Sequence, residues 1–389
     1  MTLQQKLAPT SPKRILALDG GGIRGALTLG YLQKIEEILG EQHHHDPAFR
    51  LSHYFDLIGG TSTGAIIAAA LAIGMKVEEI KTKYFELGGK IFGDRHKWYE
   101  VFSLLKARFD AGPLDKELQK VFEDITLGSD RIQTGLCIVT KRADTNSVWP
   151  IINHPEGKFF DSKLGRNKDI LLWKAVRASA AAPTYFLPQV LDVGGGLPEA
   201  AFVDGGVSMA NNPALQLLMV ATLKGFPFKW KIGAENLLLV SVGTGMGKPQ
   251  RLPQSITQNH LLDWAQQIPD MLMQDASWHN QLILQWLSAS PTRWEIDSEI
   301  GKMEEDLLVA DTSGRGLLAY LRYNYWLDQE HLQPLMEKPY SPKQIADLVD
   351  MSKAASRFEL YEIGYKAAAA EVEAAHFPLS FKPESAVLS

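Results

Sequence analysis

The stretch "FDLIGGTSTGAIIAAALAIGM" (residues 55–75) joins two different patterns across a pair of glycines. Its first part, "FDLIGG" (55–60), is a short apolar run stopped by glycine, which predicts a buried strand. Its last part, "AIIAAALAIGM" (65–75), is apolar nearly all round and predicts a buried helix. A strand that leads directly into a buried helix is typical of a sheet with helices packed on its faces.

The same alternation of strand and helix continues on both sides of this stretch. Further strands are predicted at 14–19, 135–142, 147–152, 200–206 and 236–245. Helices are predicted at 26–40, 169–182 and 213–225. Because strands that alternate with helices favour parallel pairing, we expect a three-layer α/β/α sandwich with a mostly parallel central sheet.

The chain divides into three segments by composition. Residues 1–13 are polar and predict a flexible leader, residues 14–249 hold the α/β pattern, and residues 250–389 predict a C-terminal helical extension or cap rich in tryptophan. On one continuous helix, Trp264, Trp278 and Trp286 would share a face. We expect Pro269 to interrupt that helix, and the shared face fits either core packing or contact with lipid.

Composition excludes several classes of protein. The net charge of -5 argues against a nucleic-acid polymer as partner, and the single cysteine, Cys137, excludes an intrachain disulfide framework or a multi-cysteine zinc site. The N-terminus lacks the apolar core of a signal peptide, and no run approaches the ~18 apolar residues of a membrane span. We expect a cytoplasmic protein, with export by a route other than Sec left open.

The motif "GTSTG" (60–64) fits G-x-S-x-G, in which a serine stands at the apex of a sharp turn from strand to helix. Gly60 and Gly64 let the chain turn there, and Thr61 and Thr63 flank Ser62. The start of the following helix directs its positive end at any anion that forms beside the serine. The pattern predicts Ser62 as a nucleophile.

A second glycine motif, "DGGGIRG" (19–25), also lies between a predicted strand and a predicted helix. Its backbone N–H groups suit an oxyanion that forms during ester cleavage. Glycines 20, 22 and 25 also fit G-x-G-x-x-G, the dinucleotide fingerprint, so a dinucleotide-binding oxidoreductase is the alternative. The acidic residues at the required distance, Glu41 and Asp46, fall in a loop rather than at a strand end, which disfavours that alternative.

A nucleophilic serine needs a base, and the sequence offers a carboxylate for it. Asp204 ends the predicted strand in "FVDGGVSMANNP" (202–213) and is followed by Gly205 and Gly206. We expect it on the same sheet edge as Ser62. The ten histidines lie in a polar loop or in segments without a motif, so none of them is predicted as the base.

Together, "DGGGIRG", "GTSTG" and "DGG", with "ASAAAPTYFLP" (178–188) before the last, resemble the motifs of the patatin-like phospholipase family. The resemblance covers residues 14–245. It implies a serine–aspartate dyad without histidine, with Ser62 as nucleophile and Asp204 as proton acceptor. It also implies an oxyanion hole formed by the glycine-rich loop, whose members are Gly20, Gly21, Gly22, Arg24 and Gly25.

The resemblance further implies a lipid acyl hydrolase of the phospholipase A or lysophospholipase type. Its substrates would be carboxylic esters of glycerophospholipids or other acyl lipids, reached by peripheral contact with a membrane. It implies no metal and no organic cofactor. Bacterial members of the family include effectors that are switched on by a host factor or a signalling nucleotide. A small-molecule or protein activator, or a scaffold role for the C-terminal segment, is therefore a further hypothesis, and no oligomeric state follows from the sequence.

Overall fold

The computed structural model describes residues 1–10, 12–92, 111–183, 185–194, 199–248, 253–257, 260–297, 301–303 and 316–383. The expected boundary between residues 249 and 250 lies outside these residues. The division into a leader, a catalytic domain and an extension stays a prediction.

Within the described residues, eight strands form one sheet in the order β10-β7-β1-β2-β3-β6-β5, with β4 paired on β3. The strands β10, β7, β1, β2 and β3 are parallel to one another, whereas β4 and β6 run antiparallel to β3. The bounds are β1 Lys13–Leu18, β2 Leu57–Thr61, β3 Gly135–Arg142, β4 Ser147–Ile152, β5 Gln189–Leu191, β6 Ala200–Asp204, β7 Leu237–Val242 and β10 Ala319–Tyr323, with β8 Glu295–Asp297 and β9 Gly301–Lys302 as a separate pair.

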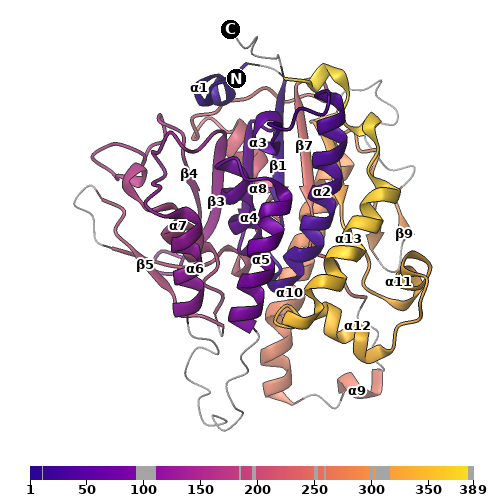
Figure 1. The fold of residues 1–389 in the computed structure, drawn as a ribbon. Coiled ribbons are helices and arrows are strands. Elements are labelled where there is room, and N and C mark those ends of the chain that lie inside the picture. Colours follow the sequence, from indigo (N-terminus) through magenta and orange to yellow (C-terminus); the bar gives the residue numbers. More distant parts are fainter. Residues whose placement is uncertain are drawn as a thin grey trace.

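Helices cover both faces of this sheet (Figure 1). None of the described helices is both long enough and apolar enough to cross a bilayer. Their bounds are α1 Leu3–Leu7, α2 Gly25–Gln42, α3 Leu51–Tyr54, α4 Thr63–Ala72, α5 Val77–Phe92, α6 Gly112–Phe122, α7 Leu172–Ser179, α8 Ala214–Thr222, α9 Pro253–Thr257, α10 Leu261–Leu287, α11 Gln329–Met336, α12 Pro342–Val349 and α13 Arg357–Glu371.

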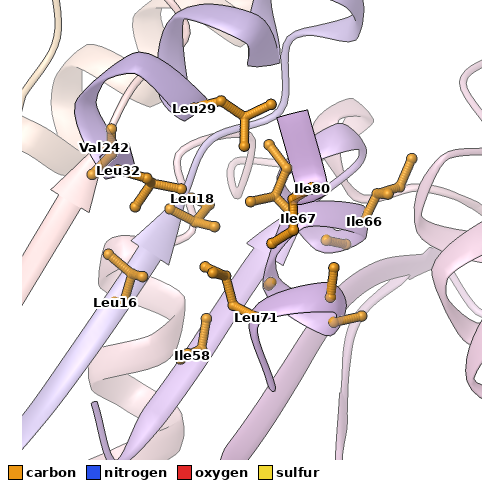
Figure 2. Close-up of a cluster of buried hydrophobic side chains, with 14 of the residues drawn as sticks. Leu16, Leu18, Leu29, Leu32, Ile58, Ile66, Ile67, Leu71, Ile80 and Val242 are labelled. Carbon is orange, nitrogen blue, oxygen red and sulfur yellow. The ribbon is translucent and has the colours of Figure 1, made fainter. Parts of the chain in front are cut away.

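Strand β1 shows how the sequence builds the two sides of the core. Its side chains alternate between the two faces, as the two-residue period of a strand requires. Leu16 and Leu18 pack toward α2 and α4 in the cluster drawn in Figure 2, whereas Ile15 and Ala17 face α8 and α10. All four side chains are fully buried, so β1 is a central strand covered on both faces. The predicted three-layer α/β/α sandwich with a mostly parallel sheet is confirmed.

The C-terminal segment contains the predicted helices and, in addition, a strand that the sequence does not predict. Helices α10 to α13 are present, but β10 joins the central sheet beside β7, with Leu321 opposite Val240. Helix α10 also runs unbroken past Pro269. The tryptophans expected on one face of this helix have different surroundings. Trp278 packs against Trp294 and Trp326, whereas Trp286 is exposed.

Helix α13 crosses α2 with almost no space between the two backbones. A Cβ atom at Gly364 would lie 2.2 Å from the carbonyl oxygen of Leu27, and one at Gly30 would lie 2.4 Å from the backbone nitrogen of Tyr365. Only glycine permits this approach. The crossing attaches the C-terminal helices directly to the helix that follows the glycine motif.

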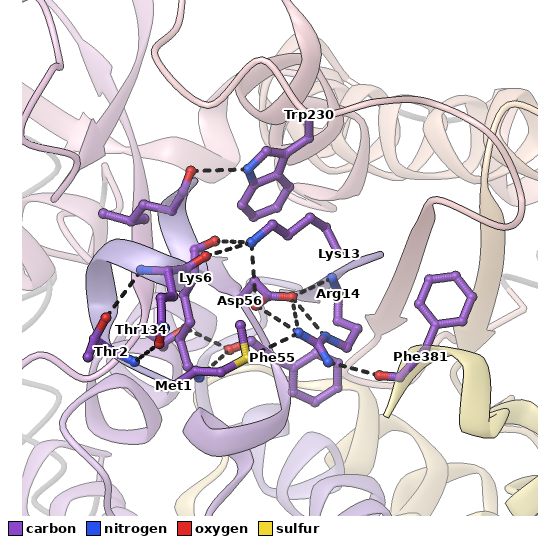
Figure 3. Close-up of polar contacts among 12 residues, drawn as sticks. Met1, Thr2, Lys6, Lys13, Arg14, Phe55, Asp56, Thr134, Trp230 and Phe381 are labelled. Carbon is purple, nitrogen blue, oxygen red and sulfur yellow. Dashed lines mark hydrogen bonds and ion pairs between the residues drawn. The ribbon is translucent and has the colours of Figure 1, made fainter. Parts of the chain in front are cut away.

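Helix α1, Leu3–Leu7, lies within the predicted leader. Thr2 and Gln5 cap the helix reciprocally, and the ammonium group of Lys6 donates to the carbonyl oxygens of Ser52 and Phe55 (Figure 3). Burial lowers the pKa of Lys6 to about 8. Because a buried ammonium without acceptors is costly, these carbonyl contacts hold α1 against the sheet.

The same polar cluster joins the two ends of the chain. Asp56 is fully buried and pairs with Arg14, with 2.7 Å between the Arg14 Nη2 and Asp56 Oδ2 atoms. The guanidinium of Arg14 also donates to the carbonyl oxygen of Phe381 at 2.8 Å (Figure 3). This contact holds Phe381, near the end of the described residues, beside the start of β1.

Candidate active site

The turn between β2 and α4 presents Ser62 in an unusual backbone conformation. Its φ of 55° and ψ of -124° lie in a region that residues other than glycine rarely adopt. The flanking glycines are sterically required, since a Cβ atom at Gly60 would lie 2.2 Å from the carbonyl carbon of Gly64, and one at Gly64 would lie 2.3 Å from the oxygen of Leu18. The turn therefore has the geometry of a nucleophile elbow.

Strand β3 brings Asp204 to this serine. Its residues Val139 and Thr140 pair with Thr61 of β2 and with Asp204 of β6, respectively. The side chain of Ser62 lies close enough to the Asp204 carboxylate to lower its pKa. The two residues meet as expected, but the reason differs, because β6 runs antiparallel and does not share the parallel edge that the sequence suggests.

The Asp204 carboxylate is 4% exposed and accepts a 2.7 Å hydrogen bond at Oδ1 from the backbone nitrogen of Gly206. Burial raises its pKa to about 6, while the nearby Ser62 side chain, the hydrogen bond from Gly206 and the charge of Arg177 act in the opposite direction. A carboxylate with a raised pKa binds a proton more readily than an exposed one, which suits a general base.

The raised pKa predicts the pH dependence of ester hydrolysis. Asp204 must be ionised to accept the Ser62 proton, so the ionised fraction, and with it kcat/KM, is expected to fall about tenfold per pH unit below about pH 6. Hydrolysis of a p-nitrophenyl ester between pH 4 and pH 9 measures this profile. An acid limb near pH 4, the value of an exposed carboxyl, would contradict Asp204 as the base.

The glycine motif after β1 lies against the elbow. A Cβ atom at Gly20 would lie 3.2 Å from the Ser62 Cβ and 2.5 Å from the Asn211 Oδ1, so only glycine fits here. The N–H of Gly20 donates to the carbonyl oxygen of Asn211 at 3.0 Å, and the N–H of Arg24 donates to Gly21 at 3.1 Å. Both of these donors are therefore already engaged within the protein.

The N–H groups of Gly21 and Gly22 have no acceptor among the residues that the structure describes. Gly22 has a φ of 56°, and the carbonyl oxygen of Met351 would lie 2.4 Å from a Cβ there. Met351 also accepts from the N–H of Ile23 at 2.8 Å. Of the five predicted oxyanion-hole residues, Gly21 and Gly22 are thus the ones with backbone donors available to a ligand.

The other two predicted residues, Arg24 and Gly25, have different surroundings. Burial lowers the pKa of the half-buried Arg24 guanidinium, and the charges of Asp270 and Asp19 oppose that shift. A Cβ atom at Gly25 would lie 2.5 Å from the hydroxyl oxygen of Tyr84. Gly25 therefore allows α2 to begin close to α5, and its role is in packing.

Ser179 holds the elbow in place, and sequence reasoning did not single it out. Its hydroxyl accepts from the Ser62 N–H at 2.9 Å and donates to the Val139 carbonyl at 2.6 Å. The signal was present in "ASAAAPTYFLP", where the side chain of Ser179 is the one hydroxyl on the last turn of α7.

Ser179→Ala is expected to reduce ester hydrolysis about tenfold or more and to lower the free energy of unfolding by about 1–3 kcal/mol. The substitution leaves the Ser62 N–H without its buried acceptor, so the strained turn loses a support. Ester turnover and urea unfolding measure the two effects. Ser162→Ala, which removes an exposed hydroxyl, is the control; equal effects from both substitutions would contradict the role of Ser179.

A buried ion pair links the glycine motif to the C-terminal strand. Arg322 of β10 donates to both carboxylate oxygens of Asp19, with Nη1–Oδ1 and Nη2–Oδ2 distances of 3.0 and 2.6 Å. The same guanidinium contacts Ser241 and Gln281. Asp19 immediately precedes the glycines, so this pair fixes the start of the loop.

Residues 16–218, just over half of the chain, match the family model described as patatin-like phospholipase. The chain belongs to this family. The matched range includes Ser62, Asp204 and the glycine motif, whereas β7 and the C-terminal segment lie beyond it. Family membership decides against the dinucleotide-binding oxidoreductase.

Individual relatives are about 30% identical to this chain over the aligned residues. A "cGAMP-activated phospholipase" from Escherichia coli (strain TW11681) is 30% identical over 62% of this chain and 65% of its own length. A "cUMP-AMP-activated phospholipase" from Escherichia coli is 32% identical over 60% of this chain and 65% of its own length. "Patatin-17" from Solanum cardiophyllum is 31% identical over 59% of this chain and 60% of its own length. The chain thus spans somewhat under two thirds of the length of these relatives.

Proposed function

We propose that this patatin-like protein hydrolyses carboxylic esters of glycerophospholipids, as a phospholipase A or lysophospholipase. The observation that carries the proposal is the placement of Ser62, on its strained turn, beside the buried Asp204 carboxylate. A serine hydroxyl in contact with a desolvated base is the arrangement that nucleophilic acyl transfer needs. The backbone donors of Gly21 and Gly22 supply a candidate oxyanion site.

In the proposed reaction, the Ser62 Oγ attacks the ester carbonyl while its proton passes to Asp204. The tetrahedral oxyanion accepts hydrogen bonds from the glycine loop, and one such donor is typically worth ~3–4 kcal/mol in the transition state. Asp204 returns the proton to the departing alcohol, which leaves an acyl group on Ser62. Water then attacks this acyl-enzyme, giving its proton to Asp204, and the fatty acid departs as Ser62 is reprotonated.

Apolar side chains beside the dyad support a lipid as the acyl donor. Val207 and Met209 follow the Asp204 motif directly and are 52% and 61% exposed, respectively. Solvent-exposed apolar side chains next to a catalytic residue favour an acyl chain over a polar substrate. Peripheral contact with a membrane surface is part of the proposal.

A fluorophosphonate probe followed by peptide mass spectrometry tests the nucleophile. We expect modification at Ser62, and release of fatty acid from phosphatidylcholine or lysophosphatidylcholine vesicles that stops when Ser62 is modified. Modification at another serine, or vesicle hydrolysis that survives complete labelling of Ser62, would overturn the proposal.

We further propose that a nucleotide activates this enzyme. The names of two relatives contain the activators cGAMP and cUMP-AMP. Both molecules include an adenosine monophosphate unit. The proposal is tested by fatty-acid release with and without cGAMP; equal release under both conditions would count against cGAMP as an activator.

A further inference from the structure

A cavity of about 410 Å³ lies beside the edge strand β10, away from the dyad. Two strands, β7 and β1, separate β10 from β2, which places the cavity about three strand spacings, or ~14 Å, from the elbow. Helices α11 and α13 lie on this side of the molecule (Figure 1). The function derived above uses no residue of this cavity as a catalytic group.

Half-buried aromatic rings form much of the cavity wall. Trp294, Tyr325 and Trp326 line it, and the ring centroids of Trp294 and Trp326 are 5.5 Å apart. Flat aromatic side chains of this kind stack on planar ring systems. The volume is large enough for one nucleotide unit and lies within the range of small-molecule sites.

Polar groups on the same wall match the edge of a purine base. Glu371 and Glu373 line the cavity, and their carboxylates can accept hydrogen bonds from an exocyclic amine. The Oε2 atom of Glu371 also accepts a hydrogen bond from the Tyr31 hydroxyl at 2.7 Å.

A simple organic cation fits the cavity less well than a neutral ring. The ammonium group of Lys248 already lies 4.7 Å from the centroid of the Trp326 ring and 3.4 Å from the Glu295 carboxylate. A second cation at that ring would meet the charge of Lys248. A choline group is therefore disfavoured here, whereas a heteroaromatic base is not.

We propose that this cavity binds the adenine nucleotide unit of an activating nucleotide and transmits its binding to the glycine loop. The inference rests on the proposed nucleotide activation of the enzyme. It adds the location of the site, the part of the ligand that is recognised and the route of coupling.

Two connections run from the cavity wall to the glycine loop. In the first, Arg322 lines the cavity, and its backbone N–H donates a 2.7 Å hydrogen bond to the Thr292 Oγ1. Its guanidinium holds Asp19. Thr292 is itself a wall residue, so both partners of this bond line the cavity.

The second connection passes through Asn324. Its Oδ1 accepts a 2.7 Å hydrogen bond from the N–H of Gly245, and the preceding Thr244 donates its hydroxyl to the Gly20 carbonyl at 3.3 Å. A Cβ atom at Gly21 would lie 2.3 Å from the Thr244 Oγ1. A shift of Asn324 would therefore move the wall against which Gly20 and Gly21 pack.

Titration of the full chain with AMP, GMP and cGAMP, followed by tryptophan fluorescence and calorimetry, tests this site. We expect AMP and cGAMP to bind, GMP to bind at least ~10-fold more weakly than AMP, and cGAMP to raise fatty-acid release. Trp294→Ala is expected to weaken cGAMP binding about tenfold or more, in line with the loss of one stacking partner. Trp294→Phe should weaken cGAMP binding less than Trp294→Ala, because phenylalanine keeps an aromatic ring that can stack.

Trp286→Ala is the matched control, since Trp286 lies on α10, is 45% exposed and is not part of the cavity wall. Hydrolysis without nucleotide should be the same in wild type and in all three variants. If cGAMP binds and activates Trp294→Ala as well as wild type, the cavity assignment is overturned while nucleotide activation stands. If neither AMP nor cGAMP binds the wild type, the site and the activation are both overturned, while Ser62-dependent hydrolysis is judged separately by the probe experiment.

Discussion

Ser62→Ala and Asp204→Asn are each expected to lower fatty-acid release by at least ~10³-fold while leaving the free energy of unfolding within about 1 kcal/mol of wild type. Ser62→Ala removes the atom that forms the acyl-enzyme. Asp204→Asn keeps the shape of the side chain but removes the base that accepts the serine proton. Losses of this size are typical when a member of a catalytic group is removed, and a second substitution in the same group then adds little.

Vesicle hydrolysis and thermal unfolding of the two single variants and the double variant measure these effects. Asp192→Asn, which changes an exposed carboxylate in the loop after β5, is the control and should retain full activity. Near-normal turnover in a folded Asp204→Asn variant would contradict the dyad. A double variant that loses the product of the two single effects would mean that the two residues act independently.

Arg322→Met is expected to lower the free energy of unfolding by about 3–5 kcal/mol. The substitution leaves the buried Asp19 carboxylate without its partner, and an uncompensated buried charge is strongly destabilising. It also removes the contacts to Ser241 and Gln281, so β10 is held less firmly in the sheet. Urea unfolding at neutral pH measures the change.

Arg131→Met is the matched control for this ion pair. Arg131 pairs with Glu123 at 2.8 Å, but both side chains are at least half exposed, and a pair of that kind contributes about 0–1 kcal/mol. If Arg322→Met lowered the free energy of unfolding no more than Arg131→Met does, the Arg322–Asp19 pair would not be what fixes the start of the glycine loop.

Local patterns predict the central strands and the elbow because the physics that forms them is local. The apolar run of 55–60 appears as β2, and the glycines on either side of Ser62 are required within four residues of one another. The helix predicted at 65–75 appears as α4, which begins directly after Ser62. The position of Asp204 beside Ser62 was also expected, although the antiparallel pairing of β6 was not.

The C-terminal segment could not be predicted in the same way. Strand β10 is short, and nothing local in its sequence shows that it pairs with β7. Ser179 lies 117 residues from Ser62, and Arg322 lies 303 residues from Asp19. Partners at such separations carry no periodicity or spacing that a single sequence reveals.

The sequence by itself determined the layered α/β architecture, the turn that presents Ser62, and the glycines without which that turn cannot form. It did so because side-chain alternation, helix period and glycine sterics act between residues a few positions apart. Only the tertiary structure decided that the C-terminal segment completes the sheet, that Gly364 brings α13 against α2, and that Arg322 holds Asp19. Those contacts depend on burial and charge pairing between distant segments, and these exist only once the chain has folded.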